Sequence, residues 1–445
     1  MPSDVLNELA GKRVVVWGNG REGQAAVHAL ASTAVMHLAV IDDTPQDGVL
    51  TGAAAAAALG DADVIIKSPG VSKYDPRVMR LAEGGVRVTG GSALWMAAHH
   101  RRTVAVTGSK GKSTTSALIH HLLASVGIPN TYGGNIGVPL LDLADDERYV
   151  VELSSYQCAE LDHSPDIAVL TALFPEHLNW HGSAERYYAD KLNLVAHSPG
   201  AVVFNATDPR LSRAVRGLRL AAPSVPVDPG GTYGVHVVEG NFALNGHALL
   251  PVATSPLRGE HNVTNVCLAL SAVRLLTLRQ TGTDLHELTQ DLTDGLRTFQ
   301  PLPHRLHVIA EQDGLRFVDD SLSTAPQAAI AALDAFADGP VALLVGGQDR
   351  GVDYEPLRDH LRDTGRAVHV IGLPSSGARI LALLHGLPAV TSELADDLTD
   401  AVRLARAALP SGGTVLLSPA APSYGIYRDH RERGAAFAAA VEASR

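Results

Sequence analysis

The chain has 445 residues, of which 46% are hydrophobic and 19% are charged, and this balance predicts a globular protein of roughly three domains. Its net charge of −11 argues against a general nucleic-acid-binding protein, although a local basic site for phosphate remains compatible with it. Two cysteines exclude a disulfide scaffold and indicate a reducing cytoplasm. The sequence opens without a basic segment and following apolar stretch, and it has no run of about 18 apolar residues, so we expect neither a signal peptide nor a membrane span.

The N-terminal segment has the outline of a mononucleotide-binding βαβ unit. Residues 13–17 predict a buried strand, residues 18–23 form a Gly-x-Gly-x-x-Gly turn, and a helix extends to about residue 30. The apolar run 38–41 ends at two aspartates, and a strand over 64–66 is followed by a Ser-Pro-Gly loop. The glycine pattern is weak on its own, because a tight turn can require the same glycines.

A second α/β unit begins with the most informative motif of the chain. Residues 103–107 predict a buried strand that enters a glycine loop, and a helical pattern follows. Such a loop binds a nucleoside triphosphate, because backbone N–H groups and the positive helix start cradle phosphate oxygens. Lys112 can reach the terminal phosphates, and the Ser113 hydroxyl can ligate Mg²⁺. The usual loop has a glycine where this chain has Val106, so an ordinary glycine turn is the alternative.

Three more residues of this unit are candidates for chemistry. Glu152 ends a predicted strand over 148–152, where a carboxylate near a phosphate loop can hold Mg²⁺, or can be a solvated edge acid. Strands are also predicted over 166–171 and 201–204. His177 stands in a polar cluster, 174–181, and is either a metal-binding or a structural histidine. Lys191 ends a helix-like stretch, and nothing local distinguishes it from a solvated lysine.

The rest of the chain completes the second unit and predicts a third α/β unit from about residue 300. Short strands and turns over 230–262 precede a helix over 262–278, and strands are predicted over 315–318, 341–345, 368–371 and 414–417. The alternation of strand and helix predicts parallel sheets in all three units. Asn262 and Asn265 share a helix face and could bind a nucleotide, although a helix cap is the alternative. Arg305 offers a guanidinium to phosphate, and the loops 346–351 and 418–423 indicate a shared pocket at the rim of one sheet.

Eight motifs in this order resemble the Mur ligases over nearly the whole chain. They are Gly-Ser-Lys-Gly-Lys-Ser-Thr (108–114), Gly-Gly-Asn-Ile-Gly (133–137), Glu-Leu-Ser-Ser-Tyr-Gln (152–157), Pro-Glu-His (175–177), His-Asn-x-x-Asn (261–265), Pro-His-Arg (303–305), Asp-Asp-Ser (319–321) and Leu-Ser-Pro-Ala (417–420). Within the family the chain is most similar to the branch that joins D-glutamate to UDP-N-acetylmuramoyl-L-alanine. Each motif is moderate alone, but their common order is highly specific.

The resemblance implies an α/β protein of three domains. A Rossmann-like domain over 1–91 would bind the UDP-sugar, a central P-loop ATPase domain with a parallel sheet over 92–298 would bind ATP, and a Rossmann-like domain over 299–445 would bind the incoming amino acid. ATP would phosphorylate the alanyl carboxylate, and the glutamate amine would attack the acyl phosphate, in peptidoglycan precursor synthesis. The family also implies two Mg²⁺ ions and small-molecule substrates. We expect a cytoplasmic monomer without nucleic-acid or membrane partners.

The resemblance also carries roles onto individual residues. The catalytic set is Lys112, Glu152, His177 and Lys191, the last matching a lysine that the family carbamylates. The metal ligands are Ser113, Glu152, His177 and carbamylated Lys191. ATP would contact Gly108, Ser109, Lys110, Gly111, Lys112, Ser113, Thr114, Asn262, Asn265, Arg305 and Asp320. The UDP-sugar substrate would contact Gly18, Gly20, Arg21, Gly23, Asp42, Ser68, Gly70 and Asn135, and the amino acid Thr324, Arg350 and Ser423.

One departure from the family concerns the amino acid. Leu322 stands where the family usually has a lysine, and Arg350 replaces another lysine, so one cation is lost and one is changed. This pattern resembles a branch that adds L-glutamate, but D-glutamate is preferred here as the commoner substrate of the family. Other readings are a folylpolyglutamate synthase, a nicotinamide-dependent oxidoreductase built on residues 13–43, and a non-catalytic nucleotide-binding relative. The N-terminal glycine unit argues against the folate enzyme, and the presence of Lys112 and Glu152 argues against the last reading.

Overall fold

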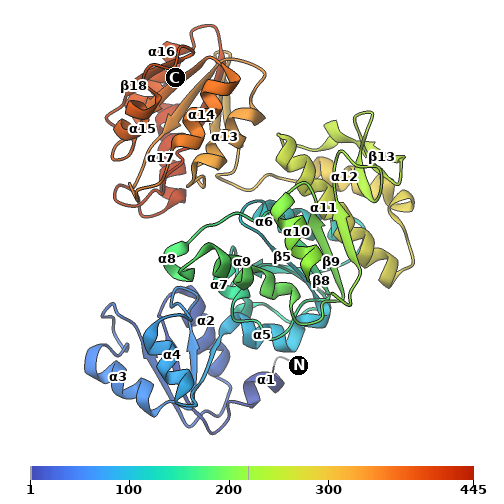
Figure 1. The fold of residues 1–445 in the computed structure, drawn as a ribbon, viewed down its shortest axis with the longest axis vertical. Helices are drawn as coiled ribbons and strands as arrows, with labels where there is room; N and C mark the ends of the chain where they lie inside the picture. The colour runs from blue at the N-terminus through green and yellow to red at the C-terminus, as the bar shows by residue number, and fades with distance from the viewer. Residues whose placement is uncertain (1–2, 219, 445) are drawn as a thin grey trace. The chain divides into compact units, whose positions relative to one another are not determined.

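A computed structural model describes residues 3–218 and 220–444 of the chain. The first two residues of the expected N-terminal domain, which also begin the segment examined for a signal peptide, lie outside the described residues. The last residue of the expected third domain lies outside them as well. The chain divides into two compact units (Figure 1): one holds the residues up to 255 together with 264–299, and the other holds 256–263 together with the residues from 300 onward.

The N-terminal sheet of the first unit is parallel, with the order β2-β1-β3-β4. Its strands are β1 (Arg13–Trp17), β2 (His37–Ile41), β3 (Val64–Lys67) and β4 (Arg87–Gly90), and its helices are α1 (Ser3–Asn7), α2 (Arg21–Leu30), α3 (Gly52–Asp61), α4 (Pro76–Glu83) and α5 (Gly91–His99). The first three strands confirm the predicted βαβ outline. β4 was missed, because four residues with a charged first position carry little periodic signal.

The central sheet of the same unit is also parallel, with the order β10-β9-β8-β5-β7-β6. Its strands are β5 (Thr103–Thr107), β6 (Thr131–Gly134), β7 (Tyr149–Glu152), β8 (Ile167–Leu170), β9 (Ala201–Asn205) and β10 (Ser224–Val227), and its helices are α6 (Lys112–Ser125), α7 (Ser155–Cys158), α8 (Leu178–His181), α9 (Ala184–Leu192) and α10 (Pro209–Gly217). The middle strands β5, β7 and β8 are buried throughout because both faces of a parallel sheet are covered.

Val106 is a buried residue of β5, between Glu152 of β7 and Val169 of β8. The glycine that the usual phosphate loop has at this position is therefore replaced by a strand residue, and the loop turns first at Gly108. An antiparallel sheet follows, with β11 (Val235–Val238), β12 (Asn241–Leu244) and β13 (His247–Pro251), and then α11 (Glu260–Gln280) and α12 (Thr289–Thr298).

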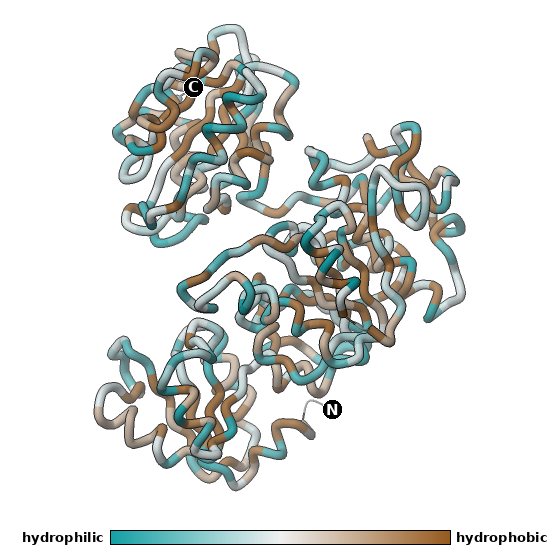
Figure 2. The backbone as a smooth tube through the Cα atoms, viewed as in Figure 1, coloured by the Kyte–Doolittle hydropathy of each residue, from teal (hydrophilic) through white to brown (hydrophobic). Residues whose placement is uncertain are grey.

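The second unit holds a sheet with the order β14-β15-β19-β16-β17-β18. Its strands are β14 (His307–Gln312), β15 (Leu315–Asp319), β16 (Val341–Val345), β17 (Val368–Gly372), β18 (Val390–Leu394) and β19 (Gly413–Leu417), and its helices are α13 (Pro326–Ala335), α14 (Glu355–Thr364), α15 (Gly377–Leu384), α16 (Leu398–Ala408) and α17 (His430–Ala443). Figure 2 shows apolar segments running through the interior of each unit, where the strands lie.

The expectation of parallel sheets is wrong for one edge of this sheet. β14 pairs antiparallel with β15 through the tight turn Asp313-Gly314, where both residues have positive φ. An Asp-Gly turn of this kind matches the right-handed twist of a hairpin, and it was present in the sequence as a signal. Within the described residues, no helix combines the length and hydropathy that crossing a bilayer demands.

Candidate active site

The phosphate loop between β5 and α6 is built so that only glycine fits at its two turns. Gly108 has φ +153°, and a Cβ there would lie 2.0 Å from the hydroxyl oxygen of Thr171. Gly111 has φ +85°, and a Cβ there would lie 2.7 Å from Oδ1 of Asn265. The backbone of the loop is thereby held close to its neighbours at the start of the 14-residue helix α6, a position that suits an anion.

The polar side chains of the loop are held by its surroundings. Lys112 Nζ donates to the carbonyls of Gly108 (2.8 Å) and Ser109 (3.2 Å), so its ammonium lies over the loop. The Ser109 hydroxyl donates to the Phe174 carbonyl at 2.6 Å, so this side chain pins the loop. Lys110 pairs with Glu176 at 3.3 Å. Ser113 and Thr114 are buried in the first turn of α6, and Asn265 also accepts from the Thr115 hydroxyl at 3.2 Å.

Glu152 presents a buried carboxylate beside this loop. Its Oε1 accepts a hydrogen bond from the Asn135 side chain at 2.7 Å. Its Oε2 is buried and has no hydrogen-bond partner among the described residues. An unpartnered carboxylate oxygen is unfavourable without a cation, and hard divalent cations prefer such oxygens. The residues at this position therefore fit a Mg²⁺ ion, with Ser113 in the first turn of α6.

Lys191 is brought to the same place by α9, although it lies 79 residues beyond Lys112 in the sequence. Its Nζ is buried and donates to the Gly108 carbonyl at 3.0 Å. Burial, and then the positive charge of Lys112, lower the pKa of Lys191 to about 7. Half of the amine is thus neutral near neutral pH, and the neutral form is the nucleophile. Sequence reasoning could not distinguish this lysine without the family resemblance, because its burial depends on the tertiary fold.

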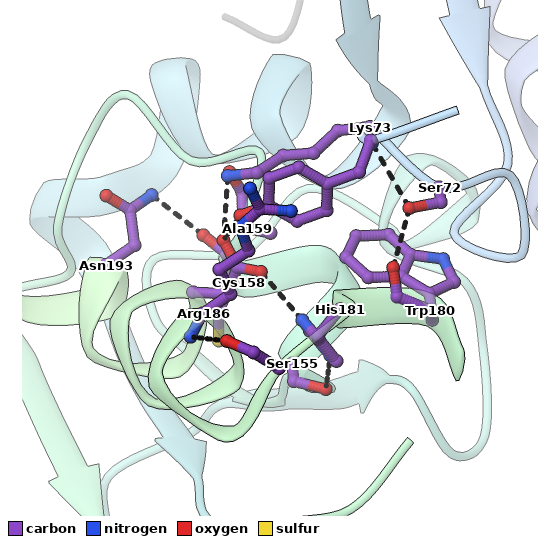
Figure 3. A network of polar contacts seen from close by, with 12 residues as sticks. Ser72, Lys73, Ser155, Cys158, Ala159, Trp180, His181, Arg186 and Asn193 are labelled. Carbon is purple, nitrogen blue, oxygen red and sulfur yellow. Dashed lines mark hydrogen bonds and ion pairs between the residues drawn. The ribbon is translucent and has the colours of Figure 1, made fainter. Parts of the chain in front are cut away.

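Helix α9 is fixed by a polar network around Asp190, the residue before this lysine. Asp190 pairs with Lys73 at 2.8 Å, accepts from the Tyr74 hydroxyl at 2.9 Å, and contacts Nδ1 of His181 at 2.7 Å. Nε2 of His181 lies 3.0 Å from the Ser155 hydroxyl oxygen (Figure 3). Lys73 and Tyr74 belong to the loop after β3, so this network joins the N-terminal sheet to the helix that carries the buried amine.

The sequence predicted His177 as a site residue but did not indicate His181 or Asp190. His177 is exposed, has φ +54° at the start of α8, and lies with its ring centroid 5.2 Å from that of Tyr156. Among the described residues, no group of three or more His, Cys, Asp or Glu side chains is placed to hold a metal by itself. His181 ends α8 and Asp190 lies in α9, so no spacing along a single helix could have found this buried pair.

The predicted UDP-sugar residues gather at the carboxyl ends of β1, β2 and β3. A Cβ on Gly18 would lie 2.5 Å from the hydroxyl oxygen of Ser68, and one on Gly23 would lie 1.8 Å from the Gly18 carbonyl oxygen. Asp42 accepts a hydrogen bond from the backbone N–H of Asn19 at 2.7 Å. Asn19, which the sequence did not indicate as a site residue, therefore lies at this site.

Other predicted residues of this region are less constrained. Gly20 and Gly70 have open space where a Cβ would lie, so no steric need explains these two glycines. Arg21 donates to the Gly137 carbonyl, which brings it to the loop that carries Asn135.

The second unit gathers its predicted residues at the carboxyl ends of the adjacent strands β15, β19 and β16. Asp320 is buried and accepts from the Ser418 hydroxyl at 2.7 Å. Burial raises the pKa of Asp320 to about 7, against the opposing effects of Ser418 and Arg305. The two neighbouring loops are bonded together, because the backbone N–H of Gln348 donates to the Pro422 carbonyl at 2.8 Å.

The predicted amino-acid residues differ in exposure. Arg350 is exposed, donates to Gln348 Oε1 at 2.8 Å, and lies 5.6 Å from the ring centroid of Tyr424. Thr324 is exposed and Ser423 is buried. Leu322, the departure from the family pattern, is half-buried, with its backbone N–H donating to the His304 carbonyl. Asn262, in α11, is buried, and its side-chain amide donates to the Arg258 carbonyl at 2.7 Å.

Comparisons with known proteins agree with this arrangement. Residues 106–273 match the Mur ligase middle domain, and residues 304–421 match the Mur ligase, glutamate ligase domain. A UDP-N-acetylmuramoyl-L-alanine--L-glutamate ligase of a Micromonospora species is 50% identical over 98% of each chain. The chain belongs to the Mur ligase family. A protein of the same description from Salinispora tropica is 49% identical over 98% of each chain, and one from Xanthomonas euvesicatoria is 39% identical over 97% of this chain and 96% of the relative.

Solved structures show that the fold is that of the Mur ligases. UDP-N-acetylmuramate-alanine ligase MurC from Thermotoga maritima is 19% identical, with a TM-score of 0.60 over 98% of this chain and 100% of its own. The MurF ligase from Thermotoga maritima, in complex with ADP, is 18% identical, with a TM-score of 0.58 over 99% and 100% of the two chains. The expected α/β fold with its Rossmann-like and P-loop domains is confirmed. As a Mur ligase, the chain is an ATP-dependent enzyme that forms amide bonds.

Proposed function

We propose that this Mur ligase adds L-glutamate to UDP-N-acetylmuramoyl-L-alanine in peptidoglycan precursor synthesis. The observation that carries the proposal is the identity of 50% along the full length of a relative described as the L-glutamate ligase. Relatives with the same description at 49% and 39% identity align over 98% and 96% of their own length. The proposal reverses the preference for D-glutamate drawn from the sequence, and it gives the replacement of a family lysine by Leu322 a role in the choice of enantiomer.

The reaction consists of two displacements. An oxygen of the alanyl carboxylate attacks the γ-phosphorus of ATP, which breaks the bond to the bridging oxygen and releases ADP. The amine of glutamate then attacks the acyl carbon, loses a proton, and displaces inorganic phosphate. Both steps depend on positioning and on neutralising phosphate charge. The ammonium of Lys112 lies over the loop carbonyls. Together with the backbone N–H groups of the loop, it neutralises the negative charge of the ATP phosphates.

The metal-binding residues of the proposal are Ser113, Glu152, His177 and Lys191. Mg²⁺ would neutralise phosphate oxygens, and the unpartnered Oε2 of Glu152 supports a cation there. Carbamylation of Lys191 is supported by its lowered pKa, because the neutral nitrogen attacks CO₂ and releases one proton to form an anion. An anion at this buried position would suit a second Mg²⁺ ion better than an ammonium does.

The remaining assignments belong to the same proposal. Residues 1–91 bind the UDP-sugar, with Gly18, Gly23, Asp42 and Ser68 at the sheet edge; 92–298 bind ATP; and 299–445 bind glutamate. Asn262, Asn265, Arg305 and Asp320 contact the nucleotide, and Thr324, Arg350 and Ser423 contact glutamate. The enzyme acts as a cytoplasmic monomer with small-molecule substrates. Both cysteines are free and buried, which fits a reducing compartment.

The test is phosphate release with ATP, Mg²⁺ and UDP-N-acetylmuramoyl-L-alanine, with L-glutamate or D-glutamate added in parallel. We expect turnover with L-glutamate, and loss of at least about a hundredfold in Lys112→Met, because a charge-neutralising group is removed. Lys12→Met is the matched control, since Lys12 is an exposed lysine of the N-terminal domain. Turnover with D-glutamate alone would refute the proposed enantiomer, and turnover with neither would refute glutamate as the substrate.

A further inference from the structure

Arg433, on α17, is a charged side chain buried deep in the second unit. Only 1% of the surface of Arg433 is exposed to solvent. Its Nε donates to the Ser321 hydroxyl at 3.0 Å, and its Nη2 donates to the carbonyls of Ser321 at 2.7 Å and of Ala421 at 3.0 Å. A longer contact of 3.5 Å joins its Nη1 to the Gly346 carbonyl. Among the described residues, the hydrogen-bond acceptors of this guanidinium are thus all neutral oxygen atoms.

Keeping a cation at such a position requires compensation, because burial removes its hydration. Burial lowers the pKa of Arg433 to about 10, while Tyr427, Asp319 and Asp320 act in the opposite direction. The side chain is therefore still protonated at neutral pH, and its N–H groups point at backbone carbonyls from several directions. A methionine of similar length would fill the space but leave those carbonyls without donors.

The carbonyls that Arg433 binds belong to three different loops. Ser321 lies in the loop after β15, Ala421 in the loop after β19, and Gly346 in the loop after β16. These strands are neighbours in the sheet, in the order β15-β19-β16. The same three loops carry Leu322 and Thr324, Ser423, and Arg350, the residues that the proposed function places around the amino acid.

The packing around Arg433 shows that the loops rest on it closely. A Cβ on Gly347 would lie 2.9 Å from Nη1 of Arg433 and 2.3 Å from the Pro422 carbonyl oxygen. A Cβ on the next residue of the helix, Gly434, would lie 2.5 Å from Oδ2 of Asp319. The glycine loop and the start of α17 therefore have no room to shift independently.

We propose that Arg433 is a positioning residue for the amino-acid site, whose guanidinium fixes the three loops that carry the glutamate contacts. The inference rests on the proposed function, because the glutamate contacts are part of that proposal. Arg433 itself is too deeply buried to touch the amino acid. Its effect is to set the distance between Arg350 on one loop and Ser423 on another, so that both can meet the carboxylates of one glutamate molecule.

The experiment compares Arg433→Lys and Arg433→Met with Arg366→Met as the matched control. Arg366 also donates to three backbone carbonyls, those of Leu333, Phe336 and Gly339, but it lies just before the amino end of β17, away from the loops. We expect Arg433→Lys to fold and to raise the KM for glutamate about tenfold or more, with the KM for ATP and for the UDP-sugar substrate changed less than about twofold. We expect the control to leave all three KM values within about twofold.

Hydrogen exchange of the free proteins provides a second measurement that does not depend on substrate. Arg433→Lys should speed amide exchange in 319–323, 346–351 and 418–423, while Arg366→Met should leave these loops unchanged. Equal rises in all KM values, or a glutamate KM and loop exchange that both match the wild type, would overturn the role of Arg433. Failure of the wild type to use either glutamate would instead overturn the proposed function, and loop exchange would then decide whether Arg433 holds the loops. If Arg433→Met does not fold, Arg433→Lys carries the test.

Discussion

Lowering the pH from 8 to 6 should remove the carbamate that the proposed mechanism requires on Lys191. The buried amine, with a pKa of about 7, has only Gly108 and Thr107 oxygens as hydrogen-bond acceptors in the described chain. Carbamylation needs the neutral amine and releases a proton. Acid therefore opposes the reaction twice, by protonating the amine and by mass action on the product.

The size of the effect follows from the lowered pKa. With a pKa of about 7, the neutral fraction falls from about 90% at pH 8 to about 10% at pH 6. A lysine with the ordinary pKa near 10.4 would be about 0.4% neutral at pH 8. At constant dissolved CO₂, the released proton lowers carbamylation by about a further hundredfold over these two pH units, by mass action. Lys191 should therefore be carbamylated at pH 8 and largely free at pH 6.

The assay is ¹³C nuclear magnetic resonance of protein equilibrated at both pH values with the same partial pressure of ¹³CO₂. We expect one carbamate resonance at pH 8, its loss at pH 6, and its absence in Lys191→Arg, which keeps the positive charge but cannot form this carbamate. Lys191→Arg should also lose activity by about a hundredfold or more, since a charge near the phosphates is inverted. A resonance that persists in Lys191→Arg, or an active Lys191→Arg enzyme, would refute the reasoning.

Three further perturbations test other parts of the structure. Gly108→Ala should reduce ATP turnover by at least about a hundredfold, because the added Cβ has no space in the phosphate loop. The control Gly127→Ala, also at positive φ but in open space, should cost only about 1 kcal/mol of unfolding free energy. Equal turnover in the two variants would contradict this prediction. Glu160→Gln removes the anionic partner, 2.8 Å away, of the fully buried Lys67 ammonium, which otherwise donates only to the neutral Val71 carbonyl among the described residues. The change should cost about 3–5 kcal/mol of unfolding free energy in chemical denaturation, so a cost below about 1 kcal/mol would count against the ion pair. Asp320 binds its proton more tightly in the folded state, with a pKa of about 7 against 3.8, so its contribution to stability falls as pH rises between these values. The melting temperature of Asp320→Asn should therefore rise relative to that of the wild type from pH 5 to pH 8. A constant difference between the two melting temperatures would show that this carboxyl is not buried as described.

The elements that sequence predicted well are those whose signal is local. The strands over 103–107 and 341–345 are continuous apolar runs, and the structure has both with the predicted bounds. The phosphate loop follows from glycine spacing, since Gly108 and Gly111 adopt positive φ within a few residues of each other. The antiparallel β14 was missed although its Asp-Gly turn is local, because the regular alternation around it favoured a parallel arrangement.

The properties of the site depend on residues that are far apart in the chain. From the sequence alone, Lys191 is indistinguishable from an ordinary helix lysine. Its pKa is lowered by burial and by the charge of Lys112, and both arise only when the fold places its ammonium beside the Gly108 carbonyl. Arg433 lies 112 residues from Ser321, and nothing in the sequence near either residue indicates their contact. Local sequence determines backbone geometry, because steric limits act between neighbouring residues. Burial and charge compensation, which set the chemistry of Lys191 and the role of Arg433, arise only when the fold brings distant segments together and excludes water from them.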